Sequence, residues 1–213
     1  MKITAIETQK KNKDRCSIFI DGTFVFGMTI SDAYLMGLKE GNSISPAELK
    51  KLKETVVLMD AKNLALRYLS YNMRTKRDVA VKLKSYEFGE DLIDEVIEFL
   101  ETHRYLDDKN YAEKYIAEKM RAGYGPFRIK QELFIKGIDA EIISESLEEA
   151  KEENDENQME KIISLLEKRI KSDTEEEFNK KERQKIYNFL NSRGFGYDDV
   201  KSAIRLYWDE INE

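Results

Sequence analysis

This sequence of 213 residues has one cysteine, one histidine and two prolines. The single cysteine, Cys16, excludes a disulfide within the chain. The single histidine, His103, excludes a metal site built on two histidines, and no second imidazole could serve as the base of a catalytic triad. Neither a signal-type apolar segment at the N-terminus nor an apolar run of about 18 residues is present. These absences predict a cytoplasmic protein.

The motifs that hold phosphates or activate nucleophiles are also missing. Neither GxxxxGK[ST] nor GxGxxG occurs, and the Gly-Tyr-Gly segment at 123–125 lacks the preceding strand that a phosphate loop needs. Cys16 lies in a predicted strand, where a thiol is usually a small apolar side chain. The adjacent Asp107 and Asp108 are explained by capping of a helix start. We therefore predict that the protein is not an enzyme and binds no metal or cofactor.

Charged residues are abundant and unevenly distributed. They make up 37% of the chain, which together with the scarcity of proline favours a helical protein. The net charge of −6 argues against nucleic acid as a partner, but the segment 61–86 carries seven basic residues and one acid, Asp78. The segment 139–160 carries ten acids and one base, Lys151. The chain is therefore electrically polarised, and its basic segment suits an anionic partner.

One stretch, residues 106–138, contains the clearest helical unit. A helix is expected over 108–121, because apolar residues recur there at helical spacing. Pro126 suits the first position of a second helix, where its missing N–H costs nothing. Gly137 suits the left-handed residue that ends this helix, and Asp139 can cap a third one. Three helices therefore follow one another, and none can bury its apolar side alone.

The same apolar pattern occurs three times in the chain. Leu83, Leu133 and Leu190 occupy equivalent positions, spaced by 50 and then 57 residues, and the extra residues of the third copy fall in the segment 172–177. Further equivalent sets are Phe88, Ile138 and Phe195; Ile93, Ile143 and Val200; and Ile97, Leu147 and Ile204. We predict a mainly α fold, an elongated, curved tandem array of three three-helix repeats similar to helix-turn-helix modules. The predicted repeats are 59–104, 105–152 and 153–213.

The most polar stretch of the chain, residues 148–157, lies between the second and third copies. One interpretation is a solvated helix end followed by a short hinge. The other is an acidic patch that contacts a basic partner or repels DNA. Both interpretations stay open.

The N-terminal residues 1–58 have a different pattern. Apolar and polar residues alternate within 3–29, and the Asp-Gly pair at 21–22 is a strong signal for a two-residue hairpin turn. A small antiparallel β ribbon is therefore expected, followed by a short helix near 31–36. The sequence Ser-Pro-Ala-Glu at 45–48 combines an N-cap, a first-turn proline and a capping-box acid, so another helix begins there. So small a ribbon is unstable alone, and we expect it to pack on the helices that follow.

Basic residues recur at equivalent places in the first two repeats, near the end of each first helix and the start of each second one. We expect them to form a basic stripe, because arginine forks suit phosphate or carboxylate groups. Tyr124 beside them could stack on or pack against a partner. The candidate residues for binding a partner or DNA are Arg67, Arg74, Lys76, Arg77, Arg121, Tyr124, Arg128, Lys130 and Lys136. The alternative is that these charges pair within a helix, such as Arg128 with Glu132, and only solvate a face.

Three segments of the sequence together resemble the RecX family of regulatory proteins. They are ALRYLS at 65–70 followed by basic residues and Thr75, LDD at 106–108 with Tyr-Ala at 111–112, and GPFRIKQELFIKGI at 125–138. The resemblance covers the whole helical part, and the N-terminal ribbon is similar to an extension of some members. Residues 71–73, Tyr-Asn-Met, replace an arginine-richer stretch that is common in the family.

The resemblance implies a non-catalytic modulator of the RecA recombinase, in DNA repair, recombination and the SOS response. Family members are tandem three-helix proteins that bind RecA and its filament on single-stranded DNA. They lie in the groove of the filament and suppress strand exchange, ATP hydrolysis and co-protease activity. The implied partners are RecA and its filament, with weak direct contact to DNA, and we expect a monomer. The residues alone leave two alternatives, a nucleic-acid-binding transcription regulator of the helix-turn-helix type and a protein-only scaffold.

Overall fold

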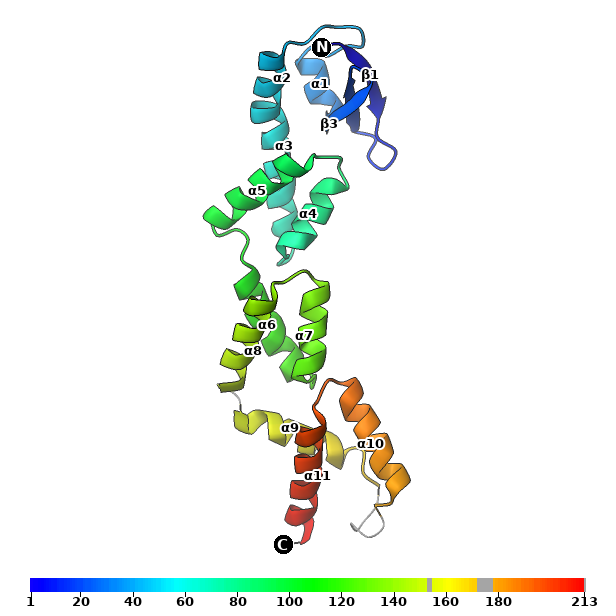
Figure 1. Ribbon diagram of the computed structural model, residues 1–213, viewed down its shortest axis with the longest axis vertical. Helices are drawn as coiled ribbons and strands as arrows, with labels where there is room; N and C mark the ends of the chain where they lie inside the picture. The colour runs from blue at the N-terminus through cyan, green and yellow to red at the C-terminus, as the bar shows by residue number, and fades with distance from the viewer. Residues whose placement is uncertain (153–154, 172–177, 213) are drawn as a thin grey trace. The chain divides into compact units, whose positions relative to one another are not determined.

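The computed structural model describes residues 1–152, 155–171 and 178–212 (Figure 1). The chain forms two compact units, Met1–Asp107 and Asp108–Glu213. Helices predominate in both units, as the composition predicts, and the strands found in the described ranges form one sheet near the N-terminus. Buried apolar side chains form one cluster in the first unit and two in the second.

The N-terminal sheet has three antiparallel strands in the order β1-β2-β3, with β1 at Ile3–Thr8, β2 at Arg15–Ile20 and β3 at Thr23–Thr29. Asp21 and Gly22 connect β2 to β3 with φ angles of 50° and 82°. Positive φ at both central positions is what the predicted Asp-Gly turn requires. A short helix, α1 at Ile30–Leu35, follows the sheet and is capped by the Thr29 hydroxyl, which accepts from the Asp32 N–H.

A long helical segment begins with α2 at Pro46–Leu52. Ser45 and Glu48 form the predicted capping box, in which each side chain accepts from the backbone N–H of the other residue. The helix continues through a π-helical segment, η1 at Lys53–Val57, into α3 at Leu58–Leu69. One continuous helical segment therefore leads from the predicted helix start at 45–48 into the first repeat.

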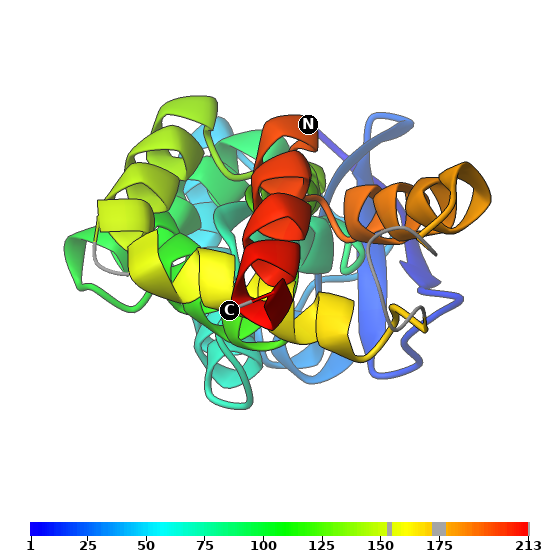
Figure 2. The ribbon, with the colours of Figure 1, turned by 90° about the horizontal axis from the view of Figure 1, so that it is seen from below.

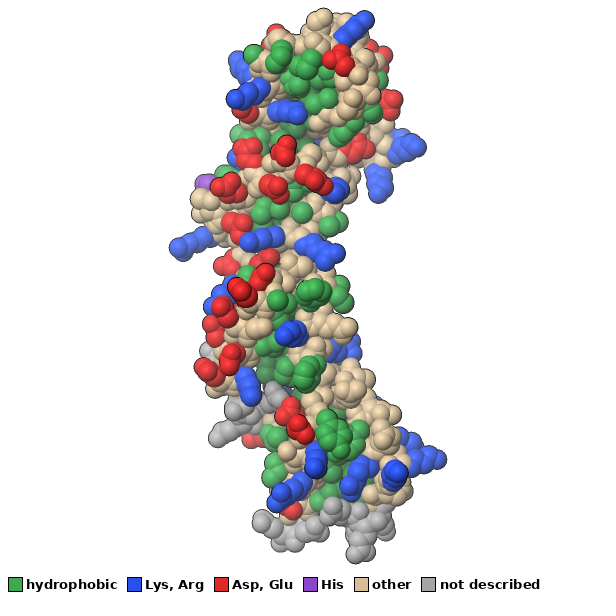
Figure 3. Space-filling view, viewed as in Figure 1, with side chains coloured by type: hydrophobic (Ala, Val, Ile, Leu, Met, Phe, Trp, Pro, Cys, Tyr) green, Lys and Arg blue, Asp and Glu red, His purple; other side chains and the backbone are tan. Residues whose placement is uncertain are grey.

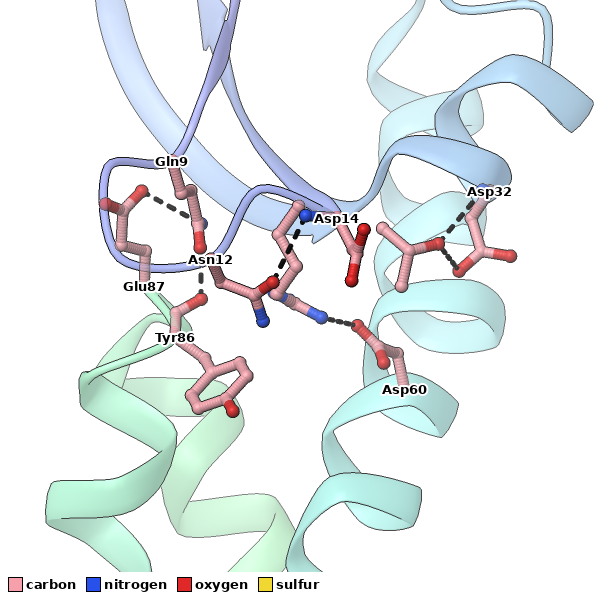
Figure 4. A network of polar contacts seen from close by, with 9 residues as sticks. Gln9, Asn12, Asp14, Asp32, Asp60, Tyr86 and Glu87 are labelled. Carbon is pink, nitrogen blue, oxygen red and sulfur yellow. Dashed lines mark hydrogen bonds and ion pairs between the residues drawn. The ribbon is translucent and has the colours of Figure 1, made fainter.

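A buried arginine joins the sheet to the first repeat. Arg15 of β2 is 3% exposed, and its Nη1 donates to Asp60 of α3 at 2.5 Å. Its guanidinium lies 4.6 Å from the centre of the Phe88 ring. Close by, the side-chain amide of Gln9 donates to Glu87 at 3.0 Å (Figure 4). The predicted packing of the sheet on the helices is thus fixed by polar contacts as well as by apolar ones.

Each repeat consists of three helices. The first comprises α3, α4 at Lys76–Lys84 and α5 at Glu90–Thr102; the second comprises α6 at Asp108–Arg121, α7 at Pro126–Ile135 and α8 at Ala140–Glu152. The third comprises α9 at Asp155–Glu167, α10 at Lys180–Ser192 and α11 at Tyr197–Asn212. In the third repeat α11 packs across α9 (Figure 2).

The equivalent positions derived from the sequence fall in the repeat cores. Leu83, Leu133 and Leu190 are each 0% exposed. The sets that begin with Phe88 and Ile93 are also buried in every copy, whereas in the last set Ile204 is buried and Ile97 and Leu147 are partly buried. Gly137 and Gly194 end their helices with φ angles of 81° and 90°, as predicted for Gly137.

The second and third repeats meet through backbone atoms. The Gly125 N–H donates to the Arg193 carbonyl at 2.8 Å, and the Phe127 N–H donates to the Gly194 carbonyl at 3.1 Å. A Cβ atom on Gly125 would lie 2.3 Å from the Gly194 oxygen, so only glycine fits there. The predicted extra segment 172–177 and residues 153–154 of the acidic segment lie outside the described residues.

Candidate partner-binding surface

Cys16 and His103, the residues whose side chains could take part in catalysis, have the contacts of structural residues. Cys16 is buried in β2, and desolvation by burial raises the pKa of its thiol. His103 ends α5, where its Nδ1 lies 2.8 Å from the Phe99 carbonyl oxygen and its ring lies beside that of Phe99. Within the described ranges, no group of three or more His, Cys, Asp or Glu residues is placed to hold a metal ion. No described helix is long and apolar enough to cross a membrane.

The candidate basic residues of the first repeat lie near the junction of α3 and α4. Arg67 and Arg77 are exposed, whereas Arg74 is partly buried with its guanidinium 4.5 Å from the centre of the Tyr68 ring. Lys76 forms an ion pair with Glu101 of α5. Stacking on Tyr68 holds Arg74 in place and leaves only part of its charge accessible.

The ion pair of Lys76 and Glu101 shows that an acid from outside the segment 61–86 neutralises one of its basic residues. Within the segment 61–86, Asp78 is the one acid, so a count over this segment gives the seven basic residues no other acid to pair with. Asp78 instead caps α4 by accepting from the Thr75 N–H at 3.2 Å. The acid that pairs with Lys76 comes from the next helix, which a count over a sequence segment cannot include.

The basic residues of the second repeat surround one carboxylate, Glu132 of α7. It accepts from the Tyr115 hydroxyl at 2.6 Å, the Lys119 ammonium at 2.7 Å and the Arg128 Nε at 2.9 Å. Hydrogen bonds from Lys119 and then Tyr115 lower the pKa of Glu132 to about 2, so it is ionised at neutral pH. The intrahelical pair of Arg128 and Glu132, the alternative to a free arginine, is therefore present.

Tyr124 is enclosed by three cations instead of projecting alone. Its ring centre lies 4.6 Å from the Arg128 guanidinium, 5.2 Å from the Lys119 ammonium and 5.4 Å from the Arg193 guanidinium. In the described part of the chain, Glu132 is the one carboxylate that pairs with any of these three cations, so the cluster has an excess of positive charge. Positive charge over an aromatic face is attractive, which allows the cations to lie so close together.

Arg193 also belongs to this cluster, although it is not one of the nine residues predicted from the sequence. Its Nη1 donates to the Gly123 carbonyl at 3.1 Å and to the Ala122 carbonyl at 3.3 Å. A signal for it was present, because Arg193 precedes Gly194 as Lys136 precedes Gly137 in the second copy. Applying the repeat alignment to charges as well as to apolar residues would have found it.

The nine candidate residues therefore fall into two groups. The exposed ones are Arg67, Arg77, Arg121 and Lys130, and the partly buried ones are Arg74, Lys76, Tyr124, Arg128 and Lys136. The structure brings Tyr124 and Arg128 together, and it places Lys76 and Arg77 side by side in the first turn of α4. Lys136 lies against aromatic rings, 5.4 Å from the centre of Tyr115. Basic side chains are visible on the repeats in Figure 3.

A β ribbon followed by three-helix repeats with cationic surfaces defines a tandem-repeat protein suited to contacts with another macromolecule. Four family descriptions match the chain: Regulatory protein RecX N-terminal domain at residues 1–45, and the first, second and third three-helix domains of RecX at residues 61–100, 107–147 and 155–204. The chain therefore belongs to the RecX family of regulatory proteins.

Individual relatives agree over nearly the full length. The chain is 35% identical to Regulatory protein RecX of Clostridioides difficile, covering 99% of this chain and 98% of the relative. It is 33% identical to that of Clostridium acetobutylicum, with the same two coverages.

Two crystal structures of RecX proteins have the same fold. The one from Lactobacillus salivarius has a TM-score of 0.63 at 35% identity, covering 70% of this chain and 96% of that chain. Another, of a regulatory protein RecX, has a TM-score of 0.58 at 26% identity and covers 94% of this chain and 98% of that one.

Proposed function

We propose that this protein is a non-catalytic, monomeric regulator of the RecA recombinase in the cytoplasm. It binds RecA and the RecA filament on single-stranded DNA along the filament groove, and it inhibits strand exchange, ATP hydrolysis and co-protease activity. Membership of the RecX family is the basis for naming this partner.

The observation that carries the proposal is the exposure of basic side chains in a chain whose net charge is −6. Arg67, Arg77 and Arg121 are exposed near helix ends of the first two repeats. Acidic residues are concentrated in other segments, six in α5 and ten in the segment 139–160. Exposed arginines of this kind contact carboxylates on a protein or phosphates on DNA, and contacts to phosphate weaken as salt rises because counterions are released.

The test is RecA ATPase on single-stranded DNA with stoichiometric amounts of this protein. We expect the wild type to inhibit turnover and the triple variant Arg67→Glu, Arg77→Glu, Arg121→Glu to inhibit at least about tenfold less potently, since each lost contact at an interface costs about 1 kcal/mol. These three positions avoid Lys76, whose reversal would repel Glu101 and disturb the fold.

The control makes the same change in net charge elsewhere. Lys10, Lys11 and Lys13 are exposed in the β1–β2 connection, and their replacement by glutamate should leave inhibition unchanged. Unchanged ATPase with the wild type would contradict the proposal. Tight, sequence-dependent binding to duplex DNA without RecA would instead indicate a helix-turn-helix transcription regulator. Inhibition that the triple reversal leaves intact would favour a protein-only contact made elsewhere.

A further inference from the structure

The outer face of α7 exposes large apolar side chains that the core does not use. Phe127 is 68% exposed, Phe134 is 66% exposed and Ile135 is 65% exposed. Lys130 is also exposed and lies between the two phenylalanines, three residues after one and four before the other, so the three side chains share a face. We call Phe127, Lys130, Phe134 and Ile135 the α7 strip.

The other two repeats show that the fold does not require an apolar strip here. At the positions equivalent to Phe127, Phe134 and Ile135, the first repeat has Arg77, Lys84 and Ser85, and the third has Gln184, Asn191 and Ser192. All six of these side chains are exposed. The same helix is therefore stable with a polar outer face, and the apolar residues of α7 need a reason outside the repeat itself. Figure 3 shows hydrophobic side chains on the surface over α7, with a basic one among them.

On α7 itself, the charges beside the α7 strip are positive, whereas Asp199 of α11 lies near Phe127 at one end of the strip. Glu132 is the one acid of α7, and its carboxylate is bound to Tyr115, Lys119 and Arg128 on another side of the helix. Lys130 is therefore the charge of α7 that a ligand lying between the two phenylalanines would meet. A complementary surface has apolar side chains for the two phenylalanines and a carboxylate for Lys130.

The exposed apolar area of the strip indicates which kind of partner it can bind. Three large apolar side chains, each two-thirds exposed, offer about 400 Å². A stable dimer needs about 800 Å² from each partner, so the strip alone is too small to join two copies of this chain, but it matches the apolar centre of a larger interface.

The geometry of the strip is also poorly suited to stacking with the bases of a nucleic acid. Phe127 and Phe134 are separated by about 10 Å along the helix axis, farther than two neighbouring bases, and Ile135 has no aromatic face.

We propose that the α7 strip is a protein-docking site. It binds an apolar segment of the RecA protein in the filament, and carboxylates of RecA border that segment. This inference rests on the proposed function, because it takes the filament as the partner. It adds a contact that is apolar and therefore far less sensitive to salt than the arginine contacts are.

The test compares filament binding by the wild type and by the double variant Phe134→Asn, Ile135→Ser, which carries the residues of the third repeat. Both positions are exposed and lie at the end of α7 away from the joint with the third repeat, so the fold should persist. We expect binding to weaken about tenfold or more, and by a similar factor at low and high salt, because the lost contacts are apolar. Lys130→Glu should also weaken binding, more strongly at low salt.

The matched control is Val81→Ser, which removes an apolar side chain that is 61% exposed on the outer face of α4, and it should bind as the wild type does. If the wild type binds filaments and the double variant binds equally well, the inference fails while the proposed function stands. If the wild type binds no filaments, both fail. An equal loss of binding to single-stranded DNA without RecA, or a wild-type dimer that the double variant abolishes, would overturn the docking site and assign the strip to DNA or to self-association.

Discussion

Arg15 illustrates how one residue links two parts of the first unit. Its guanidinium is surrounded by Asp60 and by the rings of Phe88 and Tyr86, at 4.6 and 5.5 Å from the two ring centres. Its Nε and Nη2 have no hydrogen-bond partner among the described residues, and the aromatic faces replace part of the lost hydration. A buried ion pair of this kind adds little net stability, but losing one partner leaves the other charge uncompensated.

We therefore predict that Arg15→Met lowers the free energy of unfolding by about 3 kcal/mol, as measured by urea denaturation of the full chain. Removing both charges of the ion pair, with Arg15→Met and Asp60→Leu together, should recover most of the lost stability. Lys50→Ala is the control, because Lys50 and Glu54 form a pair whose side chains are 77% and 59% exposed; it should change stability by less than about 0.5 kcal/mol. Equal stability of wild type and Arg15→Met would contradict this account.

Glu132 gives a second residue-scale prediction, on pH. Its pKa in the folded protein is about 2, below the usual value for glutamate, so its stabilising effect is fully present above about pH 4.5. That effect is lost as pH falls from about 4.5 toward 2. Because the side chain is 24% exposed, we discount the shift for solvent screening and expect about 1–2 kcal/mol at neutral pH.

The measurement compares unfolding free energies of the wild type and Glu132→Gln at pH 6 and pH 3. The difference between the two proteins should shrink at the lower pH. Lys119→Met removes the largest cause of the pKa shift and should reduce the pH dependence without abolishing it. A difference that stays constant between the two pH values would show that Glu132 acts through packing alone.

At the scale of helices and strands, local signals in the sequence carry most of the fold. The capping box at 45–48, the proline that begins α7 and the Asp-Gly turn at 21–22 each lie where they were predicted. Thr75 likewise caps α4 as its sequence context indicates. These signals are reliable because each satisfies backbone groups within a few residues of itself.

Contacts between distant elements could not be derived in this way. Nothing near Arg15 in the sequence predicts Asp60 as its partner, and nothing near Gly125 predicts the backbone of Gly194. The candidate surface shows the same limit. Its residues were identified from their charge, but which of them are exposed depends on acids and aromatic rings from neighbouring helices, such as Glu101 for Lys76.

The joint between the second and third repeats gives an element-scale prediction. Gly125→Ala should destabilise the protein by about 3 kcal/mol, because the new Cβ would lie 2.3 Å from a backbone oxygen. Gly89→Ala is a matched control: both glycines are helix N-caps with negative φ, and a Cβ on Gly89 would meet nothing within 4 Å. The control should lose about 1 kcal/mol or less.

Hydrogen exchange distinguishes the mechanism at this joint. In Gly125→Ala, amides of α10 and α11 should lose protection more than those of α4 and α5, which belong to the other unit. Uniform loss across both units would mean that the substitution acts on the whole chain.

At the scale of the whole molecule, the two compact units have separate hydrophobic cores. We predict that a fragment of residues 1–107 folds alone and unfolds cooperatively, as measured by circular dichroism during heating. A fragment of residues 1–52 should not fold, because it lacks Asp60 and the aromatic rings that surround Arg15. An unfolded 1–107 fragment would show that the first unit depends on the second.

The polar contacts of the β sheet also determine when, during translation, the sheet can reach its final packing. Arg15 is translated long before Asp60 and Phe88, the residues that enclose its charge. At elongation rates of about 5–20 residues per second, synthesis from Arg15 to Phe88 takes roughly 4–15 s, and during that time the guanidinium of the nascent hairpin stays hydrated. The first strands to be synthesised are therefore among the later parts of this unit to reach their final packing.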